Sequence, residues 1–346
     1  MVESNKIKVL NILSGSKFGG AELFFERLAV SFEKNKNIDQ QVLIKSNKER
    51  FDRLDKKVKN ISQINFFNYY NPFCSLKIEE IIREFKPQII LSWMNRASKL
   101  LPKKRISSEI KVARIGGFYK IKNYSKCDFI ITNTFDLKEY VISKGWDPKN
   151  VEYIPNFVPP KNNSKMMISN NKNKIILCMG RFHVNKAIDI IIKAMSFLPK
   201  FKLFIVGDGV LKNDYMTLIK KFELESRVKV FQWSNNISEY LNTCDILVCP
   251  SRHEPFGNIV IDGWAHKIPV VVSDTGGPAK LVKHKLNGIK FEKDNIFELV
   301  AKIKELSSDK SLKKKIINNG YNIYKKNYSE DVILSRYLSF FKRVIR

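Results

Sequence analysis

Apolar residues occur along this chain in two patterns that alternate from end to end. Short runs rich in β-branched residues, such as 201–207 and 268–273, are typical of buried parallel strands. Segments such as 21–32 and 188–198 carry apolar residues every three or four positions, which predicts helices with one apolar face. Strands that alternate with helices predict an α/β protein with doubly wound parallel sheets.

The alternation is interrupted at 157–174, a segment rich in proline, asparagine, serine and lysine that predicts a linker. The chain has 346 residues, more than a single core usually fills. We therefore expect one domain at 1–160, a second at 174–327 and a helix at 328–346. Within the first domain, the pattern predicts strands at 6–13, 41–44, 88–92 and 129–133 and helices near 21–32, 48–59, 78–85 and 136–143.

The stretch 245–282 combines a strand, a polar turn, a helix and a second strand in one short unit. Ligands of open α/β sheets bind beyond the carboxyl ends of the strands, and the turn 252–258 takes that position here. Gly257 lets a ligand approach the backbone, and the free N–H groups at the helix start suit an anion or a ring of hydroxyls. Glu254 in the turn and Asp262 in the helix could hold two parts of one polyol.

This stretch resembles the family-4 retaining glycosyltransferases of the GT-B fold. The shared features are Glu-Pro-Phe-Gly at 254–257, an acidic residue at 262, Pro-Val-Val at 269–271 and Gly-Gly-Pro at 276–278. The resemblance covers nearly the whole chain and is strongest over the second domain. It implies two Rossmann-like domains facing each other across a cleft. It also implies sugar transfer from a nucleotide-sugar donor with retention at the anomeric carbon and no protein nucleophile.

The resemblance implies roles for residues of the second domain, which would bind the nucleotide sugar. Glu254 and the backbone of Phe256, Gly257 and Asn258 would hold sugar hydroxyls. Asp262 would bind the nucleotide ribose, although the family usually has the longer Glu at this position.

Two cations flank the turn that joins the strand at 174–180 to the next helix. Arg181 and Lys186 match the family's Gly-Arg and Lys-Gly, which hold the nucleotide diphosphate, although Ala187 replaces the usual Gly. An Arg grips phosphate oxygens through two parallel hydrogen bonds, and a Lys adds a compact charge. Either residue alone could be a surface cation, but the pair at one turn favours a catalytic role in stabilising the leaving diphosphate.

The first domain offers candidates on both sides of the reaction. Gly19 and Gly20 form a turn like the family's Gly-Gly-Ala-Glu, which makes them donor-binding candidates, although a lone Gly pair is a weak signal. Asn95, Arg96 and Arg114 follow strand ends and are candidates for the acceptor side. Many relatives have a His near the last position, and this chain does not, so that role is not transferred. The local sequence here looks like bacterial lipopolysaccharide-type members.

The formal net charge of +28 allows nucleic acid, an anionic membrane surface or anionic small substrates as partners. The chain has no zinc-finger spacing and no aromatic RNA-binding signature, so we expect no nucleic acid. In this fold a C-terminal helix usually crosses back to the first domain, and the apolar face of 337–346 suits that packing. Its cations Lys342, Arg343 and Arg346 suit an anionic membrane surface.

Several absences shape the remaining expectations. No apolar run approaches the roughly 20 residues of a membrane span, and 6–13 is too short for a signal peptide, so we expect a cytoplasmic protein, peripheral on the inner face of the cytoplasmic membrane.

No Asp-x-Asp occurs, and neither His183 nor His253 has partners at metal spacing, so we expect no metal and no cofactor. Trp233 favours packing over ligand binding, and the five cysteines are interpreted as reduced core residues.

Three other classes of protein remain open. A glycoside hydrolase needs two carboxylates on opposite sides of the bond, about 5–10 Å apart, and Glu254 and Asp262 on one loop-helix element fit this poorly. A GT-B epimerase or phosphorylase should lack the combined motif. A non-catalytic carbohydrate-binding protein would release no nucleotide from sugar donors. The best-supported expectation is a glycosyltransferase that acts on a glycan or lipid-linked glycan in lipopolysaccharide or other cell-surface polysaccharide synthesis.

Overall fold

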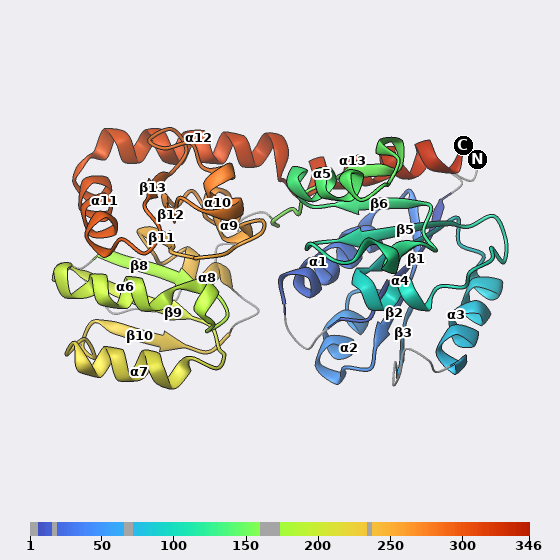
Figure 1. Cartoon of the computed structure of the whole chain (residues 1–346), viewed down its shortest axis with the longest axis horizontal. Coiled ribbons are helices and arrows are strands. Elements are labelled where there is room, and N and C mark those ends of the chain that lie inside the picture. The colour runs from blue at the N-terminus through green and yellow to red at the C-terminus, as the bar shows by residue number, and fades with distance from the viewer. Residues whose placement is uncertain (1–5, 16–18, 66–71, 160–173, 234–236) are drawn as a thin grey trace. The chain divides into compact units, whose positions relative to one another are not determined.

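A computed structural model of the chain (Figure 1) describes residues 6–15, 19–65, 72–159, 174–233 and 237–346. These residues form two compact units, and each unit has its own sheet. The first unit consists of Met1–Phe157 and Glu330–Arg346, and the second of Val158–Ser329. The predicted linker falls largely on 160–173, which lie outside the described residues.

The first unit is built on a parallel sheet with the strand order β3-β2-β1-β4-β5-β6-β7. Its strands are β1 (Ile7–Leu13), β2 (Ile38–Lys45), β3 (Ile61–Ile64), β4 (Ile89–Trp93), β5 (Ile110–Ile115), β6 (Phe129–Thr132) and β7 (Val151–Tyr153). Along β1, Val9 and Leu13 pack on one face while Leu10 and Ile12 pack on the other. Both faces are covered, which is why the strand is apolar throughout most of its length.

Helices cover both faces of this first sheet (Figure 1). One face packs against α1 (Gly20–Lys34), α2 (Lys48–Asp55) and α13 (Glu330–Ile345). The other face packs against α3 (Pro72–Phe85), α4 (Met94–Leu100), α5 (Phe135–Ser143) and the short 3-10 helix η1 (Ile121–Tyr124). A further 3-10 helix, η2 (Pro148–Asn150), precedes β7.

The second unit repeats this plan with a parallel sheet in the order β10-β9-β8-β11-β12-β13. Its strands are β8 (Lys174–Met179), β9 (Phe201–Val206), β10 (Val228–Phe231), β11 (Ile246–Cys249), β12 (Val270–Ser273) and β13 (Ile289–Phe291). One face packs against α6 (Ile188–Ala194), α7 (Lys212–Lys221) and α11 (Ile296–Ser308). The other packs against α8 (Ile237–Leu241), α9 (Asn258–Ala265), α10 (Gly276–Leu281) and α12 (Lys310–Asn327). Two 3-10 helices, η3 (Val184–Lys186) and η4 (Met195–Phe197), flank α6.

Each sheet reverses its strand order at one place. In the first unit the reversal lies between β1 and β4, and in the second between β8 and β11. At such a reversal the connections leave in opposite directions, which opens a crevice at the carboxyl ends of the two strands where ligands of α/β proteins bind. Each unit thus has one topologically defined place for a site.

The predicted fold class is confirmed, because the structure consists of two Rossmann-like α/β units. The short strands β3 and β13 were not predicted, since four and three residues carry little periodic signal. The residues that follow the strand predicted at 88–92 do not form a turn. Trp93 ends β4, and α4 begins at Met94 with no intervening loop. No helix in the described part of the chain has both the length and the apolarity to cross a bilayer.

The five cysteines are all free, and four of them are buried. Burial raises the pKa of the Cys127 thiol to about 12, so this residue stays protonated at neutral pH. The interpretation of the cysteines as core residues is confirmed for the four buried ones, whereas Cys244 is half-buried.

Candidate functional site

Three loops come together at the carboxyl edge of the second sheet. The backbone carbonyl of Asn185, in the loop after β8, accepts hydrogen bonds from the N–H groups of Arg252 and His253 after β11, at 2.8 and 3.2 Å. The carbonyl of Glu254 accepts a hydrogen bond from the N–H of Gly277 after β12, at 2.7 Å. Backbone hydrogen bonds therefore join the loops after β8, β11 and β12 at the reversal point between β8 and β11.

Two of the three predicted catalytic residues are in direct contact at this point. The ammonium of Lys186 donates a hydrogen bond to the carboxylate of Glu254, and their side chains are only 28% and 17% exposed. Burial disfavours the charged ammonium, but the neighbouring carboxylate outweighs burial and raises the pKa of Lys186. Lys186 is therefore a cation oriented by Glu254, and its ammonium has two further N–H groups that can bind phosphate oxygens.

The loop that carries Lys186 depends on one unusual backbone conformation. Ala187 is fully buried and lies in the left-handed region, at φ 50° and ψ 38°. A residue with a Cβ pays about 1–2 kcal/mol for this conformation, whereas glycine adopts it freely. The departure from Gly at this position therefore preserves the turn at a cost in strain. Arg181, the third predicted catalytic residue, is exposed at the start of the same loop.

The Gly-Gly-Pro motif fixes the backbone around Glu254 by close packing. A Cβ on Gly276 would lie 2.5 Å from the carbonyl oxygen of Glu254, and one on Gly277 would lie 2.3 Å from that of Phe256. Only glycine at both positions allows the loops after β11 and β12 to approach this closely. The motif that served as a family signature therefore has a structural role in positioning the predicted donor-binding loop.

The predicted donor-binding residues lie on that loop and at the start of α9. The Phe256 ring is buried in the core, so only its backbone is available to a ligand. Gly257 is the N-cap residue of α9 with φ 96°, and Asn258 is the first residue of the helix. Asp262 lies in the second turn of α9 and is 6% exposed. The Asp262 side chain, one methylene shorter than the Glu usual in the family, is therefore buried.

Arg252 joins the two loops that carry Lys186 and Glu254, a role that was not predicted. Its guanidinium donates two parallel hydrogen bonds to Asp189, at 3.0 and 2.9 Å, and further bonds to the carbonyl of Val184 and to Asp294. Asp189 raises the pKa of Arg252 further above its ordinary value through its hydrogen bonds and charge. A guanidinium fork held at both ends makes this residue a brace for the loop after β8.

We expect Arg252→Ala to lower the free energy of unfolding by about 1–2 kcal/mol and to weaken nucleoside diphosphate binding, because the Lys186 loop loses its brace. Chemical denaturation and calorimetric titration with a nucleoside diphosphate measure the two effects. Lys193→Ala is the matched control, since Lys193 on α6 also lies near Asp189, at 3.6 Å, but makes none of the other contacts of Arg252 that are described above. Equal behaviour of the two variants would contradict the bracing role.

Trp233 follows the carboxyl end of β10, and its side chain is 41% exposed. Of the two kinds of packing expected for Trp233, in a core or at a domain interface, the exposure contradicts the first. A large exposed aromatic ring at the ligand-binding edge of a sheet is a suitable surface for stacking a planar group.

In the first unit, Gly19 and Gly20 lie where the predicted turn meets α1, and Gly19 is next to a carboxylate. Gly19 is the N-cap residue and Gly20 the first helical residue. A Cβ on Gly19 would lie 2.3 Å from a carboxylate oxygen of Glu22, which is 6% exposed, and one on Gly15 would lie 2.8 Å from the same side chain. Gly15 and Gly19 leave space for the side chain of Glu22, whose negative charge disfavours phosphate binding at this turn.

The acceptor-side candidates Asn95 and Arg96 lie in the first turn of α4, after the strand end of β4. Asn95 is half-buried and accepts a hydrogen bond from the hydroxyl of Tyr124, whereas Arg96 is exposed. The preceding residue, Met94, has φ 62°, a strained value for a residue with a Cβ. This strained residue joins β4 directly to α4, so the first turn of α4 lies at the reversal point between β1 and β4.

Arg114, the third acceptor-side candidate, is a core residue. It is 3% exposed, and its guanidinium donates hydrogen bonds to the hydroxyl of Tyr337, the carbonyl of Ile115 and the side chain of Asn156, at 2.9, 2.8 and 2.7 Å. Its guanidinium also lies 5.5 Å from the centre of the Phe24 ring. The structure thus gives Arg114 a packing role in place of the predicted contact with an acceptor.

Two polar residues at the same edge of the first sheet were not singled out from the sequence. Ser14 follows β1 and Asn133 follows β6, and both are buried, at 2% and 7% exposure. The Ser14 hydroxyl and the Asn133 carbonyl oxygen have no hydrogen-bond partner among the residues that the structure describes. Buried polar atoms normally find one, so these atoms are available to a ligand hydroxyl. Their position directly after strand ends is the signal that could have found them.

Comparisons with known proteins agree with this geometry. Residues 161–323 match the family model described as "Glycosyl transferases group 1". The chain is 26% identical over 332 residues to the lipopolysaccharide core biosynthesis glycosyltransferase LpsE of Rhizobium meliloti, covering 93% of this chain and 95% of LpsE. It is also 26% identical over 344 residues to LpsD of the same organism, covering 97% of this chain and 98% of LpsD.

Among solved structures, Anabaena Alr3699/HepE in complex with UDP and glucose superimposes with a TM-score of 0.82. The superposition covers 97% of this chain and 99% of that one at 19% identity, and therefore shows a shared fold. The same Anabaena protein has been solved in complex with UDP-glucose, with a TM-score of 0.81. This chain thus has the GT-B fold and resembles group 1 glycosyltransferases, including lipopolysaccharide-type members.

Proposed function

Because residues 161–323 match the family model of group 1 glycosyltransferases, we propose that this protein transfers a sugar from a nucleotide-sugar donor to a glycan or lipid-linked glycan. The observation that carries the proposal is the Lys186–Glu254 pair at the strand reversal of that domain. A cation and a carboxylate held side by side suit the two ends of a sugar diphosphate. The names of LpsE and LpsD and the UDP-glucose complex of HepE support the acceptor and donor classes.

In the proposed reaction the bond between the anomeric carbon and the diphosphate oxygen breaks, and the negative charge that develops falls on the leaving diphosphate. Lys186 and Arg181 stabilise that charge from fixed positions, which is the main contribution a protein makes to such a step. Glu254 and the backbone at Gly257 hold the sugar hydroxyls. The acceptor oxygen attacks from the face that the diphosphate leaves, the diphosphate takes the acceptor proton, and the configuration at the anomeric carbon is retained.

The direct test is a nucleotide-release assay with a panel of nucleotide-sugar donors and a lipopolysaccharide-core acceptor. Acceptor-dependent release of a nucleoside diphosphate from one donor is the expected result. Binding of a donor without release under any acceptor condition would favour a carbohydrate-binding protein. Release with inversion at the anomeric carbon, measured by NMR of the product, would overturn the proposed stereochemistry.

We expect transfer to proceed without a divalent cation, because Lys186 and Arg181 supply the positive charge that a metal provides in other transferases. Among the described residues there is no group of three or more His, Cys, Asp or Glu side chains that could hold a metal ion. The measurement is the rate with excess chelator against the untreated enzyme. A rate that is abolished by the chelator and restored by magnesium or manganese would contradict this expectation.

A peripheral association with an anionic membrane surface completes the proposal. It is supported by the net charge of +28 and by the acceptor class. The C-terminal helix supports it less than its sequence suggested, because Tyr337 and Phe341 are buried and Arg343 pairs with Glu152 at 2.5 Å. Lys342 on this helix and Arg346 just after it are exposed. Sedimentation with anionic and neutral vesicles across a salt series tests the association.

A further inference from the structure

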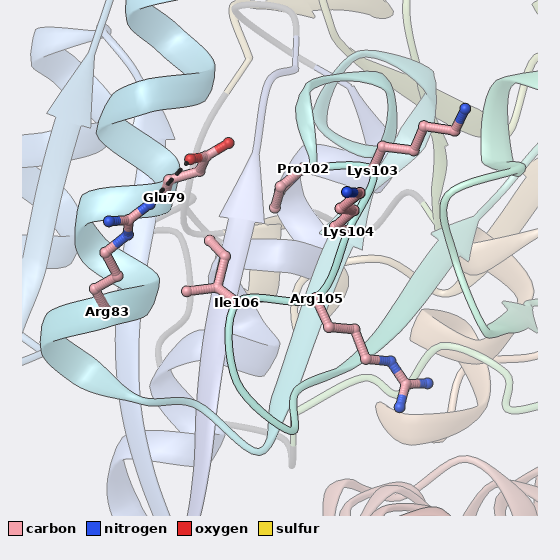
Figure 2. Close-up of a pocket in the computed structure, with 7 residues that line it drawn as sticks. All are labelled: Glu79, Arg83, Pro102, Lys103, Lys104, Arg105 and Ile106. Carbon is pink, nitrogen blue, oxygen red and sulfur yellow. Dashed lines mark ion pairs between the residues drawn. The ribbon is translucent and has the colours of Figure 1, made fainter.

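A second cluster of charged residues lies at the opposite edge of the first sheet. Glu79 and Arg83 on α3, together with residues 102–106, line a cavity of about 570 Å³ (Figure 2). The loop 102–106 leads into β5, which begins at Ile110, so the cavity lies at the amino ends of the strands. The candidate residues described above follow the carboxyl ends. A strand of five or six residues separates the two edges by roughly 17–20 Å, so the cavity is not part of the transfer site.

The lining of this cavity is strongly basic. It contains four cations, Arg83, Lys103, Lys104 and Arg105, and one carboxylate, Glu79. Arg83 lies 3.6 Å from Glu79, and Arg105 is 2.8 Å from Asp128 behind the loop.

The two lysines are exposed and form no ion pair within the described part of the chain. Figure 2 shows Glu79 and Arg83 on α3 with the loop 102–106 beside them, and the side chains of Lys103 and Arg105 extend away from the helix. Excess charge of one sign in a concave surface attracts ions of the other sign.

The loop that carries three of these cations is held rigidly from within. The buried ammonium of Lys111 donates hydrogen bonds to the carbonyls of Pro102 and Lys104, at 2.8 and 3.0 Å. The buried carboxylate of Glu109 accepts hydrogen bonds from the N–H groups of Ile106 and Ser107, at 2.9 and 2.7 Å. These hydrogen bonds fix the backbone of the loop in the absence of a ligand, so ordering the loop adds little entropy cost to ligand binding.

We propose that this cavity is a binding site for a phosphate group. Arginine forks match the oxygens of phosphate, and lysines add point charges. With Arg83 beside Glu79 and Arg105 paired with Asp128, Lys103 and Lys104 leave a formal excess of two positive charges, which suits a phosphate monoester or a diphosphate. Pro102 and Ile106 provide an apolar wall for the carbon portion of the ligand.

The phosphate has two possible sources, a soluble phosphorylated saccharide or the headgroup of an anionic lipid. The site is independent of the proposed transfer reaction.

The first experiment is calorimetric titration of the intact protein with pyrophosphate, which should show two sites. Lys103→Glu combined with Lys104→Glu should weaken one site by about tenfold or more, because two charge-assisted contacts become repulsive. Arg181→Ala should weaken the other. Loss of only the first site leaves the proposed transfer function intact, and loss of only the second leaves the cavity proposal intact.

The control is Lys314→Glu combined with Lys315→Glu, which makes the same charge change on exposed residues of α12. Sedimentation with phosphatidylglycerol vesicles and phosphatidylcholine vesicles identifies the source. Selective loss of phosphatidylglycerol binding in the Lys103/Lys104 variant assigns a lipid headgroup, and unchanged vesicle binding with weakened pyrophosphate binding assigns a soluble phosphate. Pyrophosphate and vesicle binding equal to those of the control variant would overturn the proposal. Circular dichroism and Arg83→Gln, an exposed neutral substitution, exclude misfolding as the cause of a loss.

Discussion

Replacing Lys186 with Ala is expected to weaken nucleoside diphosphate binding by about tenfold to a hundredfold and to lower the transfer rate further. The ammonium contributes a charge-assisted bond of roughly 1.5–3 kcal/mol to the diphosphate. Its loss also leaves the carboxylate of Glu254, 17% exposed, beside the ligand's negative charge. Calorimetric titration measures the affinity, and nucleotide release from the donor measures the rate. Arg181→Ala should act in the same direction.

The pairing predicts a specific non-additivity. Glu254→Gln combined with Lys186→Ala should bind a nucleoside diphosphate more tightly than Lys186→Ala alone, because the double variant no longer places a carboxylate near the phosphates. Lys200→Ala is the control, since Lys200 is exposed just before β9 at the amino edge of the same sheet. Unchanged affinity and rate in both Lys186→Ala and Arg181→Ala would rule out this site as the diphosphate clamp.

Replacing Arg114 with Leu should lower the free energy of unfolding by about 3–5 kcal/mol. The change leaves the Tyr337 hydroxyl, the Asn156 side chain and the Ile115 carbonyl without their buried donor, and each unsatisfied group costs about 1–3 kcal/mol. Denaturant titration followed by circular dichroism measures the loss. Diphosphate affinity of the second unit should stay unchanged, because all three partners belong to the first unit.

Arg96→Leu provides the comparison for Arg114, since Arg96 is an exposed arginine of the same unit and its loss should cost less than about 0.5 kcal/mol. If Arg114→Leu proved as stable as Arg96→Leu but impaired acceptor use, the predicted acceptor role of Arg114 would be restored and its structural role refuted.

The contact between Lys186 and Glu254 joins residues 68 positions apart, and the sequence placed both at strand ends of one sheet. That inference succeeded because the carboxyl ends of parallel strands share an edge, whatever the distance along the chain. The pairing itself could not be predicted, since it depends on the left-handed turn at Ala187. Strand-end position and residue type thus indicate where a site lies, while the backbone between them decides which groups touch.

Arg114 shows the limit of the same argument. Arg114 lies near the carboxyl end of β5, where ligands of parallel sheets are expected to bind. Its direction is set by Tyr337, which lies 223 positions away on a helix that packs against the opposite end of the chain. No local pattern reports a partner at that separation. Arg252 was missed for a related reason, because its partners Asp189 and Asp294 lie 63 and 42 positions away and belong to no motif.

The helix α13 gives the first unit a discontinuous sequence, and this has a consequence for synthesis. Phe32 of α1 packs against Tyr337 and Phe341, so one apolar face of the first sheet is complete only when α13 has been translated. The second unit is contiguous and can fold as soon as it is translated. Most of the first unit is therefore translated before the second unit but completes its fold after it. Until then it presents an uncovered apolar face around Phe32, which is the surface that a chaperone would protect.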